Sequence, residues 1–255
     1  MIISPNRRFV FVHVHKCAGT SIETALSTKL TVNDLVIGST TEGERNKAFF
    51  AELLSLKKHS TAAEAFKLLG EARWKSLFTF AFVRDPVDRL RSLYSYARGL
   101  AERTPLTEEE KKVFDETDTL PSRPPYKFKA VQAAVKSPNF DAFVCNPRTW
   151  QDAGAKAQWH SLCNDEGELL VNFVGKVEHI ERDWEKVQRR LHVTVELGVQ
   201  NKSPTHQPED LSPAAWLLIR KHYQRDFRLF HYPVSPAMAA VAPLKAAKPA
   251  AAPAS

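Results

Sequence analysis

The pattern of apolar and polar positions along the chain predicts buried strands, each followed by helices. Residues 8–14 (RFVFVHV) and 76–83 (SLFTFAFV) are short runs rich in β-branched and aromatic residues, which is typical of strands. Residues 168–177 (ELLVNFVGKV) form a third such run. Because the second run is apolar at both alternating sets of positions, we expect a strand covered on both faces, as in a parallel sheet.

Helices are predicted where apolar residues recur at intervals of three and four. Residues 20–27 and 44–56 have this spacing after the first strand. A third helix has explicit start and stop signals, because Thr61 and Glu64 fit a capping box and Gly70 suits the C-terminal end. These helices fill the interval between the first two predicted strands.

The second strand leads directly into another helix, since Asp85 is a good N-cap and Pro86 fits the first turn. Further helices are predicted at residues 181–191 (ERDWEKVQRRL) and after Ser212. Strands that alternate with helices in this order indicate an α/β fold. The buried stripe of the helix after Pro86 is expected to contain Val87, Leu90, Tyr94 and Ala97.

Two segments lack a clear hydrophobic pattern. Residues 103–125 are acidic and punctuated by proline, and we expect a surface excursion of the kind that often faces a substrate. Alanine and proline dominate residues 236–255, so this tail is predicted to be disordered. Residues 1–235 are therefore expected to form one domain.

The composition is that of an ordinary globular protein, with 43% hydrophobic and 25% charged residues. The formal net charge of +7 comes from 36 basic and 29 acidic residues among 255. A modest excess of this kind favours anionic partners in general without selecting nucleic acid, a glycan or a membrane surface.

The chain is expected to be cytoplasmic. Its first apolar run is short and has no cleavage site of small residues, so no secretion signal is predicted. No segment approaches the roughly 20 apolar residues of a membrane span, although peripheral association with a membrane stays open. Cys17, Cys145 and Cys163 are widely spaced and indicate neither a zinc site nor a disulfide framework.

The most informative stretch is HVHKCAGTSIETAL, residues 13–26. Lys16, Gly19, Thr20 and Ser21 lie between a predicted strand and a predicted helix. Glycine permits a tight turn, the amides at the helix start converge, and the helix dipole and the lysine add positive charge. The segment therefore suits a phosphate or sulfate group.

Three other interpretations of this loop are weaker. In the nucleotide-triphosphatase loop G-x-x-x-x-G-K-[ST] the lysine follows the glycines, whereas Lys16 precedes Gly19. A cysteine phosphatase would need arginine six positions after Cys17, and Glu23 stands there. An ordinary strand-to-helix turn has no need of a lysine.

A second anion-binding group is predicted at the end of the second strand. Arg84 occupies the carboxyl end of a buried strand, where α/β sheets bind ligands, and its guanidinium suits a phosphate. Ser92 lies seven residues after Asp85, hence on the same helix face as that residue. Together with the first loop, Arg84 and Ser92 indicate a ligand that carries two anionic groups.

These segments resemble the carbohydrate sulfotransferases of the heparan-sulfate 2-O and chondroitin type. HVHKCAGTSIE is followed by FTFAFVRDPVDRLRSLYSY, and later segments such as HYQRDFRLFHY are also similar, over roughly residues 8–232. The resemblance implies a P-loop-like sulfotransferase fold, an α/β fold with a central parallel β-sheet flanked by helices, that uses 3′-phosphoadenosine 5′-phosphosulfate (PAPS) without a metal. The family often has proline where this chain has His15.

The same resemblance assigns roles to individual residues. The loop that binds the 5′-phosphosulfate would be Lys16, Cys17, Ala18, Gly19, Thr20 and Ser21, and Arg84 with Ser92 would bind the 3′-phosphate. Lys16 would also stabilise the leaving group. His59 lies in the interval where the family places a catalytic histidine or glutamate, and is our predicted general base. The reserve candidates are Glu42, Glu44 and Glu52, followed by His13 and His160.

The predicted reaction is transfer of a sulfuryl group from PAPS to a hydroxyl of a glycan or other small acceptor, which the net charge allows to be anionic. A nucleotide kinase and a non-catalytic polyanion-binding protein are the alternatives. The sequence gives neither the acceptor nor the oligomeric state.

Overall fold

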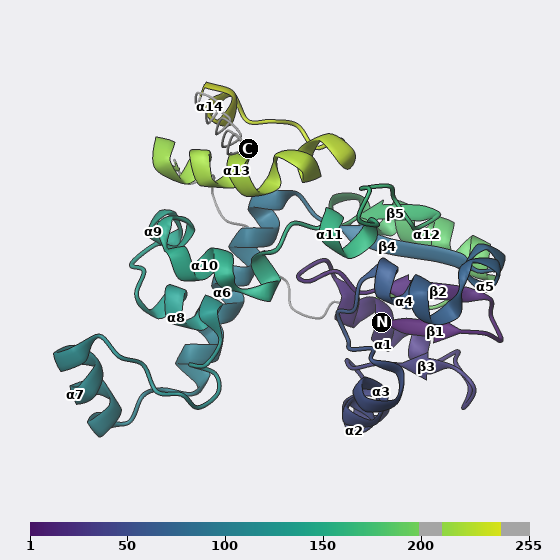
Figure 1. The fold of residues 1–255 in the computed structure, drawn as a ribbon, viewed down its shortest axis with the longest axis horizontal. Helices are drawn as coiled ribbons and strands as arrows, with labels where there is room; N and C mark the ends of the chain where they lie inside the picture. The colour runs from purple at the N-terminus through teal and green to yellow at the C-terminus, as the bar shows by residue number, and fades with distance from the viewer. Residues whose placement is uncertain (199–210, 241–255) are drawn as a thin grey trace, which may run out of the picture.

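The computed structural model describes residues 1–198 and 211–240, and is built around one sheet (Figure 1). The order of the strands across the sheet is β3-β1-β2-β4-β5. The strands are β1 (Ile2–Ser4), β2 (Phe9–Val12), β3 (Leu35–Val36), β4 (Phe78–Val83) and β5 (Phe173–Lys176).

The sheet is mixed rather than wholly parallel. Strands β2, β4 and β5 run parallel, with Phe9 opposite Phe78 and Phe80 opposite Phe173. Strand β1 is antiparallel to both β2 and β3. The α/β class is thus confirmed, whereas the expectation of a parallel sheet holds for three strands only. The extra strands have three and two residues, too few for a recognisable alternation of side chains.

Helices connect and cover the strands (Figure 1). Those around the sheet are α1 (Gly19–Ser27), α2 (Thr41–Arg45), α3 (Lys47–Leu54), α4 (Ala62–Leu69), α5 (Glu71–Ser76) and α12 (Ile180–Leu191). The others are α6 (Pro86–Arg103), α7 (Glu108–Thr117), α8 (Lys129–Val135), α9 (Phe140–Cys145), α10 (Pro147–Gln151), α11 (Trp159–Leu162), α13 (Pro213–Leu229) and α14 (Pro236–Ala240).

Several predicted helix starts are confirmed. Thr61 and Glu64 form the reciprocal bonds of a capping box at the start of α4. The Asp85 carboxylate accepts hydrogen bonds from the amides of Val87 and Asp88 at the start of α6, at 2.9 and 3.1 Å. These caps satisfy amides that the helix itself leaves unbonded.

Other parts of the helix prediction were wrong. The single helix expected over residues 44–56 is two helices, α2 and α3, which meet at Asn46. The surface excursion contains a further helix, α7, which starts with a capping box of Thr107 and Glu110. Helices α8 to α11 are between four and seven residues long, so each shows too little periodicity to be predicted.

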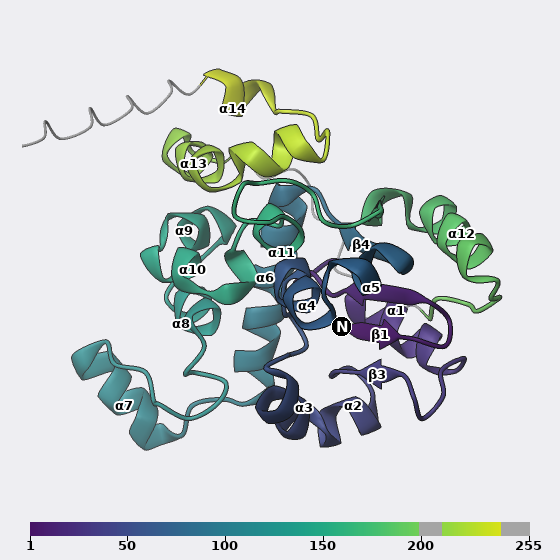
Figure 2. The ribbon, with the colours of Figure 1, turned by 45° about the vertical axis from the view of Figure 1, so that its right-hand side comes forward.

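The two faces of the sheet belong to different hydrophobic clusters, because side chains alternate along each strand. Phe9, Phe11, Phe80 and Phe82 pack with α1 and α12 on one face. Val10, Val12, Ala81 and Val83 pack on the other face with α4 and α5, in a cluster that extends to α6, α8, α9 and α13. Figure 2 shows this second group of helices gathered beside α6, at one side of the sheet.

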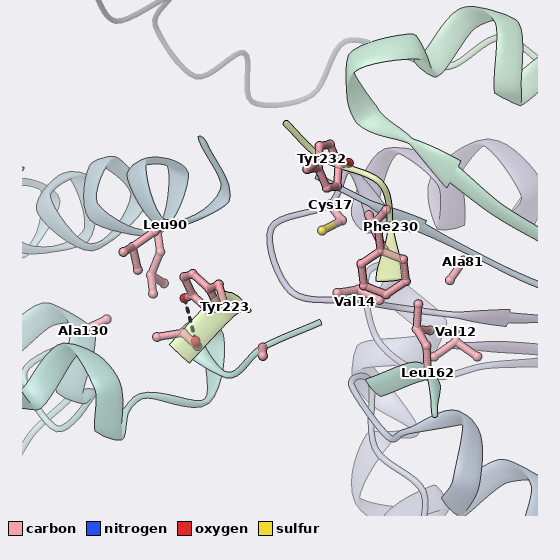
Figure 3. Close-up of a cluster of buried hydrophobic side chains, with 14 of the residues drawn as sticks. Val12, Val14, Cys17, Ala81, Leu90, Ala130, Leu162, Tyr223, Phe230 and Tyr232 are labelled. Carbon is pink, nitrogen blue, oxygen red and sulfur yellow. Dashed lines mark hydrogen bonds between the residues drawn. The ribbon is translucent and has the colours of Figure 1, made fainter. Parts of the chain in front are cut away.

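The large cluster holds the strand ends and the helices together. Figure 3 shows Cys17, Phe230 and Tyr232 near Val14, which follows β2, and Tyr223 beside Leu90 of α6. The Tyr223 hydroxyl donates to the Ala155 carbonyl oxygen at 2.6 Å. The cluster therefore surrounds the ends of β2 and β4, where the predicted site residues lie.

The first five residues of the predicted tail form α14, in which Met238 is buried. Residues 241–255 lie outside the described residues, so the domain boundary at residue 235 and the disorder of the tail stay predictions. Over residues 1–198 and 211–240, none of the helices combines the length and apolar character needed to cross a bilayer.

Candidate active site

The loop between β2 and α1, residues 13–18 and here called the Lys16 loop, contains two non-glycine residues in the left-handed region. Lys16 has φ 63° and Ala18 has φ 59°, a conformation that costs an L-residue roughly 1–2 kcal/mol. Left-handed residues within a loop of this kind direct successive amides toward one point and form a nest for an anion. The strained conformation is thus the one that an anion-binding loop requires.

The start of α1 adds helix amides to this loop. The first helical hydrogen bond is donated by the amide of Ile22 to the carbonyl of Ala18, at 3.2 Å. The amides of Gly19, Thr20 and Ser21 precede it, and no side chain caps the helix or places an acid in its first turn. This end of α1 therefore presents unneutralised positive partial charge.

Gly19 is required by close packing and not by a left-handed backbone conformation. It is absent from the residues with positive φ. A β-carbon at Gly19 would lie 2.1 Å from Cδ2 of His13, whose ring is buried beneath the loop. The structure thus adds a packing reason for glycine at this position to the tight turn expected from the sequence.

Lys16 is half-buried, and its ammonium nitrogen lies 4.0 Å from the centre of the Tyr96 ring on α6. Burial, followed by the charge of Arg84, lowers the pKa of Lys16 to about 8. Two basic side chains from different strand ends are thus close enough to repel each other. An anion placed between them would relieve that repulsion.

Arg84 follows the last residue of β4 and is half-buried. Its guanidinium has no hydrogen bond or ion pair with any side chain in the described parts of the chain, and its backbone is held by Gln158. Ser92 and Tyr96 are one turn apart and so share a face of α6. Because Tyr96 contacts Lys16, Ser92 lies on the side of α6 that faces the Lys16 loop.

The first turns of α6 are buried at Ser92 and Arg89, on the side opposite the apolar stripe, whereas Tyr96 one turn further along is 50% exposed. Ser92 is 7% exposed and Arg89 is 1% exposed. Arg89 donates to the carbonyl oxygens of Gly154 and Lys156, both at 2.7 Å. Val87 and Tyr94, which were expected in the buried stripe, are half-buried and pack against the edge of the large cluster.

His59 lies against the Lys16 loop. Its Nδ1 is 3.0 Å from the main-chain oxygen of His13, and because a carbonyl only accepts, Nδ1 must carry the proton. The Nε2 atom is then unprotonated, with a lone pair available to act as a base. Burial lowers the pKa of His59 to about 2, so the ring is neutral.

His15 packs on His59, which gives this unusual residue a structural role. The two ring centroids are 3.5 Å apart, with 22° between the ring planes. Burial lowers the pKa of His15 to about 3, so two neutral rings are stacked. This contact makes His15 a packing partner of His59.

His13 and Glu23 form a buried pair under the loop. Nδ1 of His13 is 2.9 Å from Oε2 of Glu23, and the side chains are 4% and 0% exposed. The buried α-amino group of Met1 also contacts Glu23. Glu23 therefore points to the underside of the loop, and it does not face the anion-binding side.

The remaining candidates for the base are less suitable. Glu42 and Glu44 form ion pairs with Arg45 and Lys47 on exposed α2 and α3, and Glu52 is also exposed. His160 is exposed and stacks on Trp159, at 3.7 Å between ring centroids. None of these contacts joins them to the Lys16 loop.

Cys17 is a buried thiol, not a nucleophile. Burial raises its pKa to about 12, so the thiolate that would attack an electrophile is not formed at neutral pH. Its Sγ lies 3.2 Å from Oε1 of Gln158. Cys145 and Cys163 are free thiols as well.

Sequence reasoning did not identify Gln158 or Asp226. Both are 0% exposed, and Asp226 accepts hydrogen bonds from the amides of Gln158 and Trp159, at 2.8 and 2.9 Å. Arg89 lies close enough to Asp226 to lower its pKa, although burial raises the pKa more. No motif marks either residue, because their partners are distant in sequence.

A cavity of about 280 Å³ lies between the start of α6, at Asp85 and Val87, and α13. Its walls include the aromatic rings of Trp216 and Phe227 and the side chain of Asp85. Burial raises the pKa of Asp85 to about 6. In the described parts of the chain, no group of three or more histidine, cysteine or acidic residues is arranged to hold a metal ion.

Comparison with known families adds an independent line of identification. Residues 1–233 match a model described as the sulfotransferase family, which covers both strand ends and the Lys16 loop. No curated protein and no solved structure matches the chain. The resemblance found in the two sequence segments is confirmed at the level of the family, whose members transfer sulfuryl groups and generally use PAPS. The chain belongs to the sulfotransferase family.

Proposed function

We propose that this protein transfers the sulfuryl group of PAPS to a hydroxyl of a glycan or other small hydroxylated acceptor. The proximity of Lys16 and Arg84 carries the proposal. Both are half-buried, and the charge of Arg84 lowers the pKa of Lys16. Two mutually repelling cations at neighbouring strand ends favour a ligand with two anionic groups, and PAPS has one on each side of its ribose.

The residues present fit such a donor. The nest of the Lys16 loop and the amides of Gly19, Thr20 and Ser21 suit the 5′-phosphosulfate. Arg84 and Ser92 suit the 3′-phosphate, since a guanidinium forms paired hydrogen bonds with phosphate oxygens. We thus propose that β2, the Lys16 loop and α1 bind the 5′-phosphosulfate as a P-loop binds phosphate, although here the lysine precedes the glycine.

The cavity between the start of α6 and α13 suits the purine ring. Trp216 and Phe227 give it aromatic walls, against which a planar base stacks favourably. Asp85, which lines the cavity, directly follows Arg84, the residue proposed to bind the 3′-phosphate. The proposed site therefore accommodates both charged ends and the apolar part of one nucleotide.

PAPS, when bound, supplies the sulfuryl group and a 5′-phosphate leaving group. Lys16 stabilises the negative charge that develops on the leaving oxygen. His59 accepts the proton of the acceptor hydroxyl on Nε2, while Nδ1 keeps its bond to the His13 carbonyl. Anionic groups near Lys16 would raise the low pKa of His59 and make it a stronger base.

The acceptor class and a cytoplasmic location are parts of this proposal. A net charge of +7 is compatible with an anionic acceptor, and all three cysteines are free thiols. The net charge bears on the class of acceptor, and the free thiols bear on the location; neither identifies one acceptor compound.

Thermal unfolding of the purified protein tests the donor assignment. Adenosine 3′,5′-bisphosphate should raise the melting temperature, whereas ATP with magnesium should not. The reverse result would indicate a nucleotide kinase, and stabilisation by heparin alone would indicate a polyanion-binding protein. Mass spectrometry of candidate glycans incubated with PAPS and the protein then identifies the acceptor by the added sulfuryl mass.

A further inference from the structure

One buried side chain connects the two predicted anion-binding segments. Oε1 of Gln158 accepts hydrogen bonds from the amide of Arg84 at 2.9 Å and from the thiol of Cys17 at 3.2 Å. Its Nε2 donates to the carbonyl oxygen of Arg84 at 2.8 Å. Gln158 is 0% exposed, so these contacts are made without competition from water.

The contacts with Arg84 replace a missing strand partner. The last residue pair between β4 and β5 is Val83 with Lys176, and Arg84 lies just beyond it. Gln158 supplies one acceptor and one donor to the backbone of Arg84, as a neighbouring strand would do. Because both backbone groups are held, the direction in which the guanidinium leaves the chain is fixed.

The contact with Cys17 holds the other segment. Cys17 lies between Lys16 and Ala18, the two residues with positive φ. Such residues adopt this conformation only where surrounding contacts maintain it. The thiol has one proton and lies 3.4 Å from the His15 carbonyl and 3.2 Å from Gln158, so the shorter contact links the loop to the strand end.

Gln158 is itself fixed in place. Its backbone amide donates to Oδ2 of Asp226 at 2.8 Å. The side chain of Asp226 is fully buried on α13 and also receives the amide of Trp159 at 2.9 Å. The side chain of Gln158 is therefore attached to a rigid part of the molecule, as a positioning residue must be.

We propose that Gln158 is the positioning residue that sets the separation between the Lys16 loop and Arg84. The inference rests on the proposed function, because it assumes one ligand with an anionic group for each segment. Lys16 and Arg84 repel each other in the absence of an anion, and Gln158 resists their separation. A ligand that reaches both segments then binds without first drawing them together.

The test compares ligands that reach one or both segments. Gln158→Met keeps the length of the side chain and removes its hydrogen bonds with Arg84 and Cys17, together with a longer one from Nε2 to Oδ2 of Asp226 at 3.4 Å. Calorimetry should show that adenosine 3′,5′-bisphosphate binds this variant about tenfold more weakly, whereas adenosine 5′-phosphate and adenosine 3′-phosphate change about threefold or less, since only the two-site ligand depends on the separation. A parallel loss for all three ligands, or no loss, would overturn the inference.

Two variants of Cys17 test the same inference if Gln158→Met does not fold. Cys17→Ala removes the loop contact, and Cys17→Ser retains a donor. The alanine variant should selectively weaken binding of the bisphosphate, and the serine variant should restore part of that loss. Equal binding by the two variants would contradict the proposed link.

Gln132→Met is the matched control, because the Nε2 of Gln132 donates to the Tyr126 carbonyl at 2.9 Å, remote from both segments. Its affinity for all three ligands should equal that of the parent. If the parent protein itself does not bind the bisphosphate, the proposed function and this inference both fail. If the parent binds it and Gln158→Met binds all three ligands like the parent, only the inference fails.

Discussion

The imidazole rings of His15 and His59 are stacked, with their centroids 3.5 Å apart. His15 directly precedes Lys16, whereas His59 lies much further along the chain, after α3. The stack therefore places the proposed base next to the proposed leaving-group residue. It also holds the ring of His59 while Nδ1 donates to the His13 carbonyl.

Replacing His59 should remove transfer and leave donor binding intact. In His59→Gln, the new side chain offers an amide that can still donate to the His13 carbonyl, but it has no group that accepts a proton at neutral pH. We expect the rate of transfer to fall about 100-fold or more, with the affinity for adenosine 3′,5′-bisphosphate unchanged within a factor of about three. Rates are measured with PAPS in excess, and affinity by calorimetry.

The exposed residue His192 at the end of α12 provides the control. His192→Asn tolerates the positive φ of this position and should retain full activity. Undiminished turnover in His59→Gln would exclude His59 as the base.

The stacked histidines make the stability of the fold sensitive to mild acid. Burial lowers the pKa of His15 to about 3 and of His59 to about 2, from the value of 6.5 that is usual for an exposed histidine. Below pH 6.5 the unfolded chain therefore binds protons that the folded chain does not, and the free energy of unfolding declines as the pH falls. Each histidine contributes at most about 2 kcal/mol of this loss between pH 6.5 and 5.

His15→Phe isolates this effect, because phenylalanine can stack on His59 but does not titrate. Urea unfolding at pH 7.5 and pH 5 should show a smaller loss of stability in the variant than in the parent. Asp85, whose pKa is raised to about 6, contributes with the opposite sign, but equally in both proteins. Equal losses in parent and variant would mean that His15 titrates normally.

The side chain of Lys16 is expected to favour binding of the bisphosphate but to lower the stability of the fold. Its φ of 63° favours glycine over any other residue. Lys16→Gly and Lys16→Ala both remove the cation, and the affinity for the bisphosphate should fall about 10- to 100-fold in each. Urea unfolding should show the glycine variant to be more stable than the alanine variant by up to about 1 kcal/mol. Normal donor affinity in either variant would contradict the cofactor assignment.

Gly19 tests the packing of the loop over His13. A β-carbon there would lie 2.1 Å from the His13 ring, and the ring is confined by Glu23. Gly19→Ala should therefore lower the free energy of unfolding by about 1–3 kcal/mol. Gly99→Ala is the control, because its new β-carbon meets only the flexible end of Arg103 at 3.1 Å. Its free energy of unfolding should rise by about 0.5–1 kcal/mol. Chemical denaturation compares the two, and equal stabilities would refute the packing argument.

The parts of the site that depend on local sequence could be predicted. The order of strand, Lys16 loop and helix follows from adjacent residues, as does the cap at Asp85 before α6. Gln158 could not be predicted, because it contacts Cys17 and Arg84 across 141 and 74 residues.

Glu23 shows a second reason for the limits of prediction. Six positions after Cys17 it would repel a phosphate if it faced the loop's ligand, but one turn of α1 carries it to the buried side, against His13. The direction of a side chain depends on where the helix packs, and short helices such as α11 have too little pattern to reveal that. The antiparallel strand β1 could not be predicted either, because its three residues are too few to show a pattern.

Arg84 gives the most direct test of the two-anion site. Its guanidinium is proposed to bind the 3′-phosphate only, so Arg84→Ala should reduce the affinity for adenosine 3′,5′-bisphosphate to about that for adenosine 5′-phosphate, roughly a 10- to 100-fold loss. Affinity for adenosine 5′-phosphate should fall by a factor of about three or less, because its single phosphate is proposed to bind at the Lys16 loop and not at Arg84. The pKa of Lys16, followed by NMR after reductive methylation, should move up from about 8. Arg98→Ala, on the exposed face of α6, should change neither quantity. Equal weakening of both nucleotides in Arg84→Ala would show that Arg84 supports the loop and does not bind a separate phosphate.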